Sequence, residues 1–414
     1  MDWRVDCIVQ RGDCGRGLTA HGIDGVGRVK KIHLGLLFGG RSCEHEVSVI
    51  SARSILQAID RDKYEVSLIG IDKTGHWHLA EDFDALLDDG TVKPLPRIDA
   101  DDSTVAGNPV TLALHNHGNL SPAGRGAERK PLPALDVIFP ALHGTFGEDG
   151  ALQGVFEMAG IPYIGCGVAA SAAAMDKSLA KKIFRAAGIP QAPYIDATVE
   201  QWQRAPAGII ERSEAQLDWP VFVKPANLGS SIGISKARDR DGLRTAIEFA
   251  LRFDSKIVIE QSLENCREIE CAVLGHAHDA QASTVGEIIP GAEFYDYTTK
   301  YLDDKSELVA PAEVPAAVAE RVRELSLAAF REIGGDGLAR VDFLVARDDG
   351  KVTLNEINTM PGFTPISMYP RLWAASGVPY PQLIDRLITL ALQTHRAKSR
   401  LQRDIDIKVY SSRA

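Results

Sequence analysis

Short apolar runs alternate with segments of helical spacing along most of the chain. Residues 32–38, 64–71 and 135–140 are strand-like runs, and between the first two the apolar residues from Val47 to Ile59 recur at helical spacing. This strand–helix–strand alternation predicts an α/β protein whose parallel-type sheet is covered by helices.

Two β-rich runs further along flank the polar, Gly-containing turn at residues 347–351, a pattern typical of a β-hairpin. Because side chains alternate along a strand, the hairpin places Asp342 opposite Glu356 and Arg340 opposite Asn358, within a residue of register. Two carboxylates and an amide supply the hard oxygen ligands that suit Mg²⁺. A solvated hairpin face carrying an arginine–carboxylate pair is the alternative, and the hairpin alone leaves both open.

A Gly-rich segment, residues 229–233, joins two strand-like runs, so it is neither a Rossmann turn nor a Walker A loop. Such a strand–turn–strand can fold over phosphates, although a purely structural turn is the default reading. Lys224 on the strand that enters the loop and Lys177 at a helix start are candidate phosphate cations. Glu260 and Glu268 are candidate acceptors for an adenine amino group or for ribose hydroxyls.

Composition narrows the class of protein. The 414 residues are long enough for two or three domains, and the net charge of −10 does not indicate nucleic-acid binding. No apolar run reaches the roughly 18 residues of a membrane span, and the first 30 residues lack a signal-peptide core. Six cysteines without metal-binding spacing fit a reduced, cytoplasmic protein.

Four segments differ from the alternating pattern. Residues 1–31 are predicted to be a disordered extension or a start-site artefact, and residues 99–133 a surface insertion. Residues 290–306 are a candidate mobile lid. Residues 396–414 form a polar tail.

Six separately placed motifs together resemble one family. Residues 222–233, 258–261 and 340–362 resemble the ATP-grasp fold and are most similar to D-alanine–D-alanine ligases. Three further motifs, residues 39–48, 143–150 and 295–301, resemble that family's substrate motif, second signature and ω-loop. The resemblance covers about residues 32–395, and nothing carries over to the N-terminal extension or the insertion.

The resemblance implies a three-lobed ATP-grasp fold. An N-terminal Rossmann-like substrate domain would span residues 32–165, a small central domain residues 166–263, and a catalytic domain residues 264–395. It also implies a homodimer and the formation of D-alanyl-D-alanine for peptidoglycan synthesis, with ATP as co-substrate and two Mg²⁺ or Mn²⁺ ions. ATP phosphorylates one D-alanine carboxylate, and the amine of a second D-alanine then attacks the acyl phosphate.

The same resemblance assigns roles to residues. The metal ligands would be Asp342, Glu356 and Asn358, with Glu356 bridging two ions. The nucleotide would contact Lys177, Lys224, Ser230, Ser231, Glu260, Glu268 and Lys300.

The substrate contacts follow in the same way. Glu44 would bind the ammonium of the first D-alanine, and Ser230 and Tyr301 would form a hydrogen-bonded chain to it. Arg340 and the Gly362 N–H would stabilise the tetrahedral oxyanion. The remaining substrate contacts would be His143, which orients the first D-alanine, and Ser367, which meets the carboxylate of the second.

Several of these residues could instead have a purely structural role. Glu44 would be stabilising as a helix-capping carboxylate in any case. His143 could be a loop residue satisfied by nearby backbone, Ser367 could cap a turn, and Tyr301 could be a surface-loop aromatic.

The acceptor and the activity itself also have alternatives. Lys300 and Tyr301 match the dipeptide-forming rather than the D-lactate-forming pattern. Another ATP-grasp carboxylate–amine ligase and a catalytically silent nucleotide-binding protein are the two rival classes.

Overall fold

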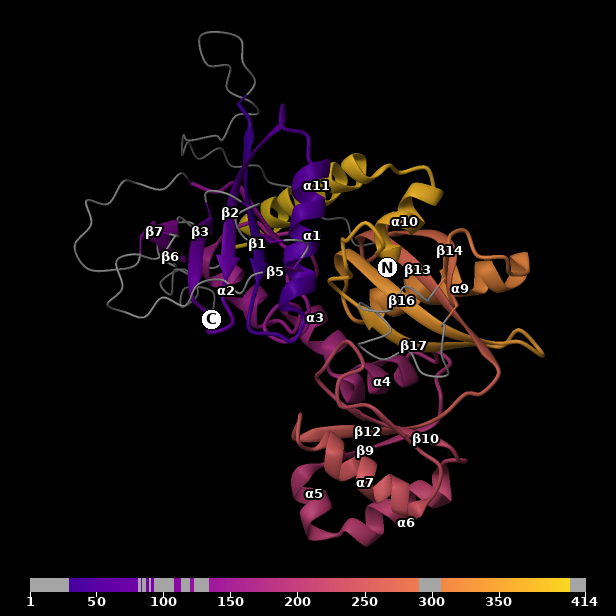
Figure 1. Ribbon diagram of the computed structural model, residues 1–414. Coiled ribbons are helices and arrows are strands. Elements are labelled where there is room, and N and C mark those ends of the chain that lie inside the picture. The colour runs from indigo at the N-terminus through magenta and orange to yellow at the C-terminus, as the bar shows by residue number, and fades with distance from the viewer. Residues whose placement is uncertain are drawn as a thin grey trace, which may run out of the picture.

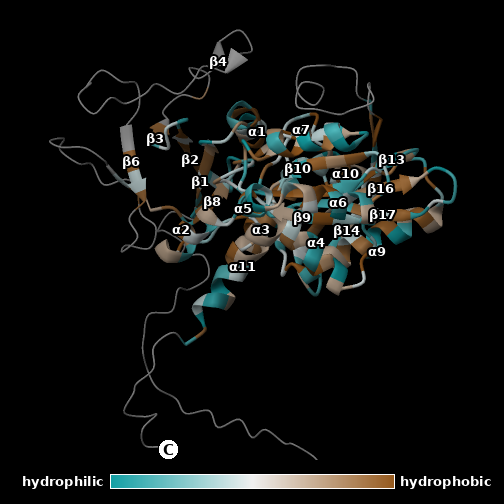
Figure 2. Cartoon of the chain, turned by 90° about the horizontal axis from the view of Figure 1, so that it is seen from below, coloured by the Kyte–Doolittle hydropathy of each residue, from teal (hydrophilic) through white to brown (hydrophobic). Residues whose placement is uncertain are grey.

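The computed structural model describes residues 30–80, 83, 87–88, 91–92, 108–112, 120–122, 134–289 and 307–402, arranged in three lobes (Figure 1). Two lobes lie side by side, and a third projects below them through α4 (Figure 1). Figure 2 shows hydrophobic residues along strands such as β1 and β8, and hydrophilic ones on surface helices such as α7. In the part of the chain described, no helix is long and apolar enough to cross a membrane.

The N-terminal lobe is a six-stranded sheet in the order β7-β6-β3-β2-β1-β8. β1 pairs in parallel with both β2 and β8, as the alternating pattern predicts, whereas β3, β6 and β7 add antiparallel strands that make the sheet mixed. β6 and β7 come from the predicted insertion, so part of that insertion extends the sheet. The elements are β1 (Ile32–Gly39), α1 (His45–Ala58), β2 (Tyr64–Ile71), β3 (Trp77–Ala80), β4 (Leu87–Asp88), β5 (Thr91–Val92), β6 (Asn108–Leu112), β7 (Leu120–Pro122), β8 (Val137–Pro140) and α2 (Ala151–Ala159).

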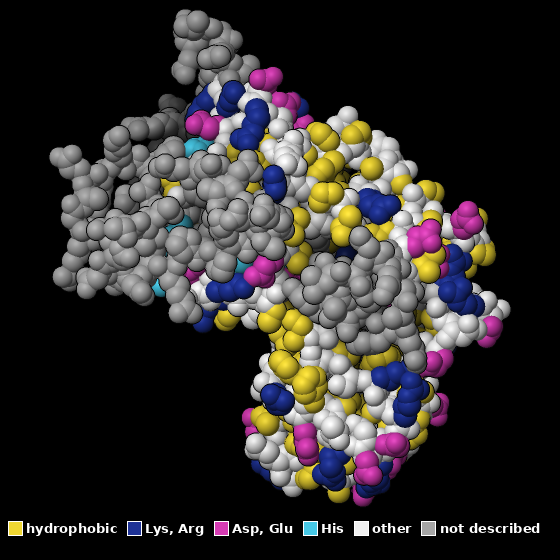
Figure 3. All heavy atoms as spheres, in the orientation of Figure 1, with side chains coloured by type: hydrophobic (Ala, Val, Ile, Leu, Met, Phe, Trp, Pro, Cys, Tyr) yellow, Lys and Arg dark blue, Asp and Glu magenta, His cyan; other side chains and the backbone are white. Residues whose placement is uncertain are grey.

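The lower lobe is a four-stranded antiparallel sheet in the order β11-β10-β12-β9, packed on helices α5, α6 and α7 through a core that includes Trp202, Ile210 and Leu243. On the face of this lobe seen in Figure 3, Lys and Arg are interspersed with Asp and Glu. The elements of this lobe are β9 (Tyr194–Thr198), α5 (Val199–Arg204), α6 (Pro206–Gln216), β10 (Val221–Pro225), β11 (Ser235–Ala237), α7 (Arg240–Ala250) and β12 (Lys256–Gln261). Two helices precede it, α3 (Val168–Met175) and α4 (Lys177–Ala186), and both pack against the C-terminal lobe through residues such as Ala174 and Phe184.

The C-terminal lobe is a five-stranded antiparallel sheet in the order β15-β14-β13-β16-β17. α11 continues past the predicted catalytic domain, so residues 396–399 of the predicted tail are helical. The elements are β13 (Cys266–His276), β14 (Gln281–Ile289), β15 (Glu307–Val309), α9 (Ala316–Glu332), β16 (Asp336–Ala346), β17 (Val352–Asn358), α10 (Met368–Ala375) and α11 (Tyr380–Ser399).

One hydrophobic core joins the N-terminal and C-terminal lobes. Leu36 and Phe139 of the first sheet belong to the same buried cluster as Leu338 of β16 and Leu387 of α11. Burying a side chain of this size contributes about 1.5–3 kcal/mol. The shared core therefore fixes the ends of β1 and β8 relative to the hairpin β16–β17.

Candidate active site

The hairpin β16–β17 has the register predicted from the sequence. Asp342 pairs with Glu356 and Arg340 with Asn358, and a bulge follows between Asp342 and Phe343. The alternate side chains of β16, including Phe343, point into the apolar core beneath α9. The four polar side chains therefore share the face opposite α9.

Arg340 is held between two carboxylates. Its Nε and Nη2 atoms each donate to Asp342 over 2.7 Å, and its Nε lies 3.1 Å from Oε2 of Glu270 on β13. Burial alone would lower the pKa of Arg340, but Asp342 and Glu270 outweigh it and raise that pKa well above its usual value. Asn358 donates from Nδ2 to the same carboxylate of Asp342 over 2.9 Å. The guanidinium is therefore permanently charged.

The Gly-rich segment forms the predicted turn between two strands of the lower sheet. β10 and β11 pair antiparallel on either side of it, and Ser230 and Ser231 both adopt positive φ. A Cβ at Gly233 would lie 2.7 Å from Pro225 and 2.9 Å from Phe253, so glycine is required there. The ammonium of Lys177, in the first turn of α4, donates to the carbonyl of Leu228 at the start of this loop.

Behind the loop, one buried carboxylate is shared by two lysines. Glu260 accepts from Lys224 over 2.6 Å and from Lys181 of α4. Although burial works in the opposite direction, the two ammonium groups lower the pKa of Glu260 to about 2. Burial alone would lower the pKa of Lys224, but Glu260 outweighs it and raises that pKa. For Lys181 burial dominates and lowers the pKa. A charged Glu260 and a charged Lys224 therefore line the same cavity beside the loop.

Glu44 points out of the N-terminal lobe toward the loop. It occupies the N-cap position of α1, where its charge favours the helix as the capping alternative expects, but its side chain makes no capping hydrogen bond. The carboxylate instead accepts from the Ser230 hydroxyl, as the predicted chain requires, and is 8% exposed. A Cβ at Gly144 would lie 2.6 Å from Glu44, and one at Gly229 3.1 Å from it, so two glycines leave room for the carboxylate.

Glu148 is a second carboxylate beside Gly144, and it was not among the site residues predicted from the sequence. It accepts from the Gly144 N–H over 2.8 Å. Burial, reinforced by the charge of Glu44, raises the pKa of Glu148 to about 8. Glu148 lies within the motif at residues 143–150, so the motif itself was the signal.

The raised pKa of Glu148 predicts a pH effect on stability. Between the ordinary carboxyl pKa of about 4.3 and the folded value of about 8, the folded state binds more protons than the unfolded state, so the free energy of unfolding falls as pH rises. Glu148→Gln removes this penalty, and its stability relative to the parent protein should increase steadily from about pH 5 to about pH 8. Urea unfolding of both proteins across that range measures the difference; a constant difference would contradict the assignment.

His143 is buried with both ring nitrogens engaged. Nδ1 lies 3.0 Å from the Met360 carbonyl and Nε2 lies 3.0 Å from the Ser51 hydroxyl, which also accepts from the Phe363 N–H over 3.3 Å. Because a carbonyl only accepts, Nδ1 carries the proton. Burial lowers the pKa of His143. The backbone alternative therefore accounts for the Nδ1 contact, whereas the Nε2 contact is to a side-chain hydroxyl.

Gly362 and Ser367 lie together beyond the end of β17. A Cβ at Gly362 would lie 2.6 Å from the Ser367 hydroxyl oxygen, so the backbone passes close to this serine. Ser367 also accepts from the Thr364 N–H over 3.0 Å, which matches the turn-capping alternative without excluding substrate contact.

Two cavities meet at the hairpin. The larger, about 330 Å³, lies between the loop and β13 and is lined by Lys177, Lys224, Ser230, Ser231, Glu260 and Glu268. The smaller, about 170 Å³, is lined by Arg340, Asp342, Gly362 and Ser367. Glu356 and Glu268 line both cavities. Lys300 and Tyr301, with the rest of the predicted lid, lie outside the described residues.

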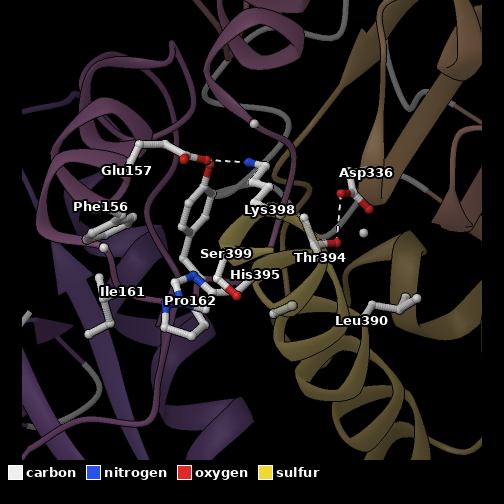
Figure 4. Close-up of a pocket in the computed structure, with 16 residues that line it drawn as sticks. Phe156, Glu157, Ile161, Pro162, Asp336, Leu390, Thr394, His395, Lys398 and Ser399 are labelled. Atoms are coloured by element: carbon white, nitrogen blue, oxygen red, sulfur yellow. Dashed lines mark hydrogen bonds and ion pairs between the residues drawn. The ribbon is translucent and has the colours of Figure 1, made fainter. Parts of the chain in front are cut away.

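A separate cavity of about 270 Å³ lies where β16 begins (Figure 4). Lys398 of α11 donates to Glu157 there, and Thr394 donates to Asp336 over 2.8 Å, so its polar groups tie α11 to both upper lobes. None of the predicted site residues lines it.

The site unites a phosphate-type loop of one sheet, a carboxylate hairpin of another and a buried carboxylate of the N-terminal lobe. Together, these lobes have the three-lobed ATP-grasp arrangement that the sequence predicted. Solved structures agree: a D-alanine–D-alanine ligase from Coxiella burnetii superposes with a TM-score of 0.75 at 34% identity, covering 92% of this chain and 99% of that one. The VanG D-Ala:D-Ser ligase from Enterococcus faecalis gives a TM-score of 0.75 at 33% identity, covering 87% and 100%.

Sequence comparison identifies the family. Residues 33–166 match the family described as "D-ala D-ala ligase N-terminus" and residues 183–389 the one described as "D-ala D-ala ligase C-terminus". A D-alanine–D-alanine ligase from Acetivibrio thermocellus is 47% identical, covering 87% of this chain and 96% of its own. D-alanine–D-alanine ligase A from Salmonella typhimurium is 46% identical, covering 90% and 99%. The chain belongs to the D-alanine–D-alanine ligase family.

Proposed function

We propose that this protein uses ATP to join two D-alanine molecules into D-alanyl-D-alanine, a precursor of peptidoglycan. The observation that carries the proposal is the position of Glu44: a buried carboxylate from the N-terminal lobe bonds to Ser230 of the phosphate loop, beside two cavities that meet at Glu356. Family membership supports the same reaction.

ATP would lie in the larger cavity with its phosphates under the loop. Lys177, Lys224 and the hydroxyls of Ser230 and Ser231 would bind the phosphates, and Glu260 would accept from the adenine amino group. Glu268 lies where the two cavities meet and would accept from the ribose. Phosphate binding draws Lys224 away from Glu260, and Lys181 then keeps that carboxylate paired.

The role of Lys181 predicts a change in ATP binding. Lys181→Met should raise KM for ATP about tenfold, about 1.4 kcal/mol, because Glu260 then retains Lys224 as its only cation. We expect kcat to stay within about twofold of the parent value, because neither Lys181 nor Glu260 touches the reacting carboxyl. The exposed neighbour Lys182, paired with Asp196, supplies the control Lys182→Met. An unchanged KM in Lys181→Met would refute the role.

The hairpin fits a divalent metal by its donor chemistry. Asp342 and Glu356 are adjacent carboxylates, and Asn358 uses its Nδ2 toward Asp342, which leaves its amide oxygen available. These three residues would hold two Mg²⁺ or Mn²⁺ ions, with Glu356 between them, although the described residues contain no group of three His, Cys, Asp or Glu side chains arranged for a metal. When bound, the ions would neutralise phosphate charge.

The first D-alanine would place its ammonium at Glu44 and its carboxylate toward the smaller cavity. A carboxylate oxygen takes the γ-phosphoryl group, giving ADP and D-alanyl phosphate. The second D-alanine, anchored by Ser367, reacts as its neutral amine after its ammonium has given one proton to solvent. This amine attacks the acyl carbon; the C–N bond forms, the C–O bond to phosphate breaks, and the second proton lost from nitrogen leaves with the phosphate. Arg340 and the Gly362 N–H would stabilise the intermediate oxyanion.

The acceptor is the finer part of the proposal. We infer an amine rather than a hydroxyl from Lys300 and Tyr301, and D-alanine from the relatives' names. The likeness to a D-Ala:D-Ser ligase makes D-serine the second candidate. Purified protein with ATP, Mg²⁺ and D-alanine, alone or with D-serine or D-lactate, should release phosphate and yield mainly D-alanyl-D-alanine; ATP binding without phosphate release would favour the silent alternative.

Two further predictions belong to the proposal. ATP is made and consumed in the cytoplasm, and the described cysteines are free thiols, which suits the predicted location. The homodimer is a prediction from the family.

A further inference from the structure

A row of three carboxylates crosses the C-terminal sheet. Glu270 on β13 is opposite Asp342 on β16, which is opposite Glu356 on β17. Only the latter two belong to the predicted metal site. Glu270 is 3% exposed and reaches Arg340 across the small Ala272, which is the strand partner of Arg340.

Arg340 engages both carboxylate oxygens of Asp342. Nε donates to Oδ1 and Nη2 to Oδ2, both over 2.7 Å, and Asn358 adds a third donor to Oδ2. Both oxygens of Asp342 are therefore committed to N–H groups. A cation bound by Asp342 would face the guanidinium charge directly.

Arg340 needs another partner once Asp342 binds a cation, because an uncompensated buried charge is strongly unfavourable. Glu270 is already in position: its Oε2 lies 3.1 Å from Arg340 Nε, while the Nε–H is directed at Asp342. A small rotation of the guanidinium would redirect that N–H to Glu270 while keeping Arg340 in the smaller cavity, which both side chains line.

We propose that Glu270 is a positioning residue that receives Arg340 when Asp342 binds metal, and so holds the guanidinium at the reacting carboxyl. The proposal rests on the proposed function. Glu270 acts through Arg340, and it is not itself a metal ligand. Metal affinity therefore depends on Glu270 only when Arg340 is present.

A double-mutant cycle tests this dependence. Mn²⁺ binding to the full-length protein with saturating ADP is measured by electron paramagnetic resonance for the parent, Glu270→Gln, Arg340→Leu and the double variant. Glu270→Gln should weaken Mn²⁺ binding about tenfold, a usual loss for a partner behind a metal ligand. In the Arg340→Leu background the same change should weaken it less than about twofold.

Two results of this experiment would overturn the proposal. If Glu270 were a metal ligand, or merely attracted the cation by its charge, Glu270→Gln would weaken Mn²⁺ binding at least as much without Arg340, because the guanidinium would no longer screen that charge. An equal or larger loss of Mn²⁺ affinity in the Arg340→Leu background therefore overturns the proposal. So does an unchanged affinity in Glu270→Gln. Glu287→Gln, which breaks the buried pair with Arg267 in the same sheet, is the matched control and should leave Mn²⁺ affinity unchanged.

A second Glu270 variant and a parallel assay of dipeptide synthesis complete the test. If Glu270→Gln does not fold, Glu270→Asp replaces it: the shorter carboxylate should weaken Mn²⁺ binding about threefold, and no change overturns the proposal. Dipeptide synthesis by the parent protein is measured in parallel. Absent synthesis refutes the proposed function, whereas normal synthesis with unchanged Mn²⁺ affinity in the Glu270 variants refutes this inference alone.

Discussion

Replacing Glu356 with glutamine is expected to reduce kcat for phosphate release about a thousandfold while leaving ATP affinity within about threefold. Glu356 lines both cavities and is adjacent to Asp342 across the hairpin, so in the proposed reaction its charge would lie where the phosphoryl group passes. The amide preserves size and removes that charge. ATP is still bound by the loop and the lysines, which lie on other elements.

The measurement pairs steady-state phosphate release with calorimetric titration of ATP. Glu320→Gln, an equivalent change at an exposed carboxylate of α9 that pairs with Arg323, should behave like the parent protein. An active Glu356→Gln protein would contradict the bridging role, and loss of ATP binding would move Glu356 into the nucleotide site.

Replacing Glu44 with glutamine should lower kcat/KM for D-alanine at least a hundredfold, because removing one member of a buried ion pair costs about 3–5 kcal/mol. The carboxylate is 8% exposed, so water does not compensate for the lost charge. The glutamine can still accept from Ser230, which keeps the loop in place. KM for ATP should therefore change little.

Glu46→Gln is the matched control for this prediction. Glu46 lies in the first turn of α1, two residues after Glu44, but it is only half-buried and pairs with Lys73 over 2.5 Å. If both variants lost D-alanine affinity equally, the effect would come from charge at the start of α1. If neither did, Glu44 would not bind the ammonium.

The alternation of side chains along the two strands was sufficient to predict the register of the hairpin β16–β17. Strand alternation places Asp342 and Arg340 on one face, and a single turn fixes their partners, so the register followed from the sequence within one hairpin. The bond between Ser230 and Glu44 joins residues far apart in the chain, and only the resemblance to a family predicted it.

Other features required the tertiary structure. Glu270 lies on the same face of β13 as Glu268, but which hairpin lies beside β13 depends on how the sheet assembles. Lys181 is one helical turn after Lys177, yet a helix position does not reveal that the side chain is buried against Glu260. β6 and β7 lie in a polar stretch whose composition predicts a loop, and only their pairing at one side of the first sheet makes them strands.

The central claim is that this site transfers phosphate to the carboxylate of D-alanine before the peptide bond forms. Purified protein is incubated with Mg²⁺, unlabelled ATP and D-alanine carrying ¹⁸O in both carboxylate oxygens, and the released phosphate is analysed by mass spectrometry. We predict that each phosphate carries one ¹⁸O and that each is matched by one molecule of D-alanyl-D-alanine. Unlabelled phosphate, or pyrophosphate with AMP, would contradict the claim.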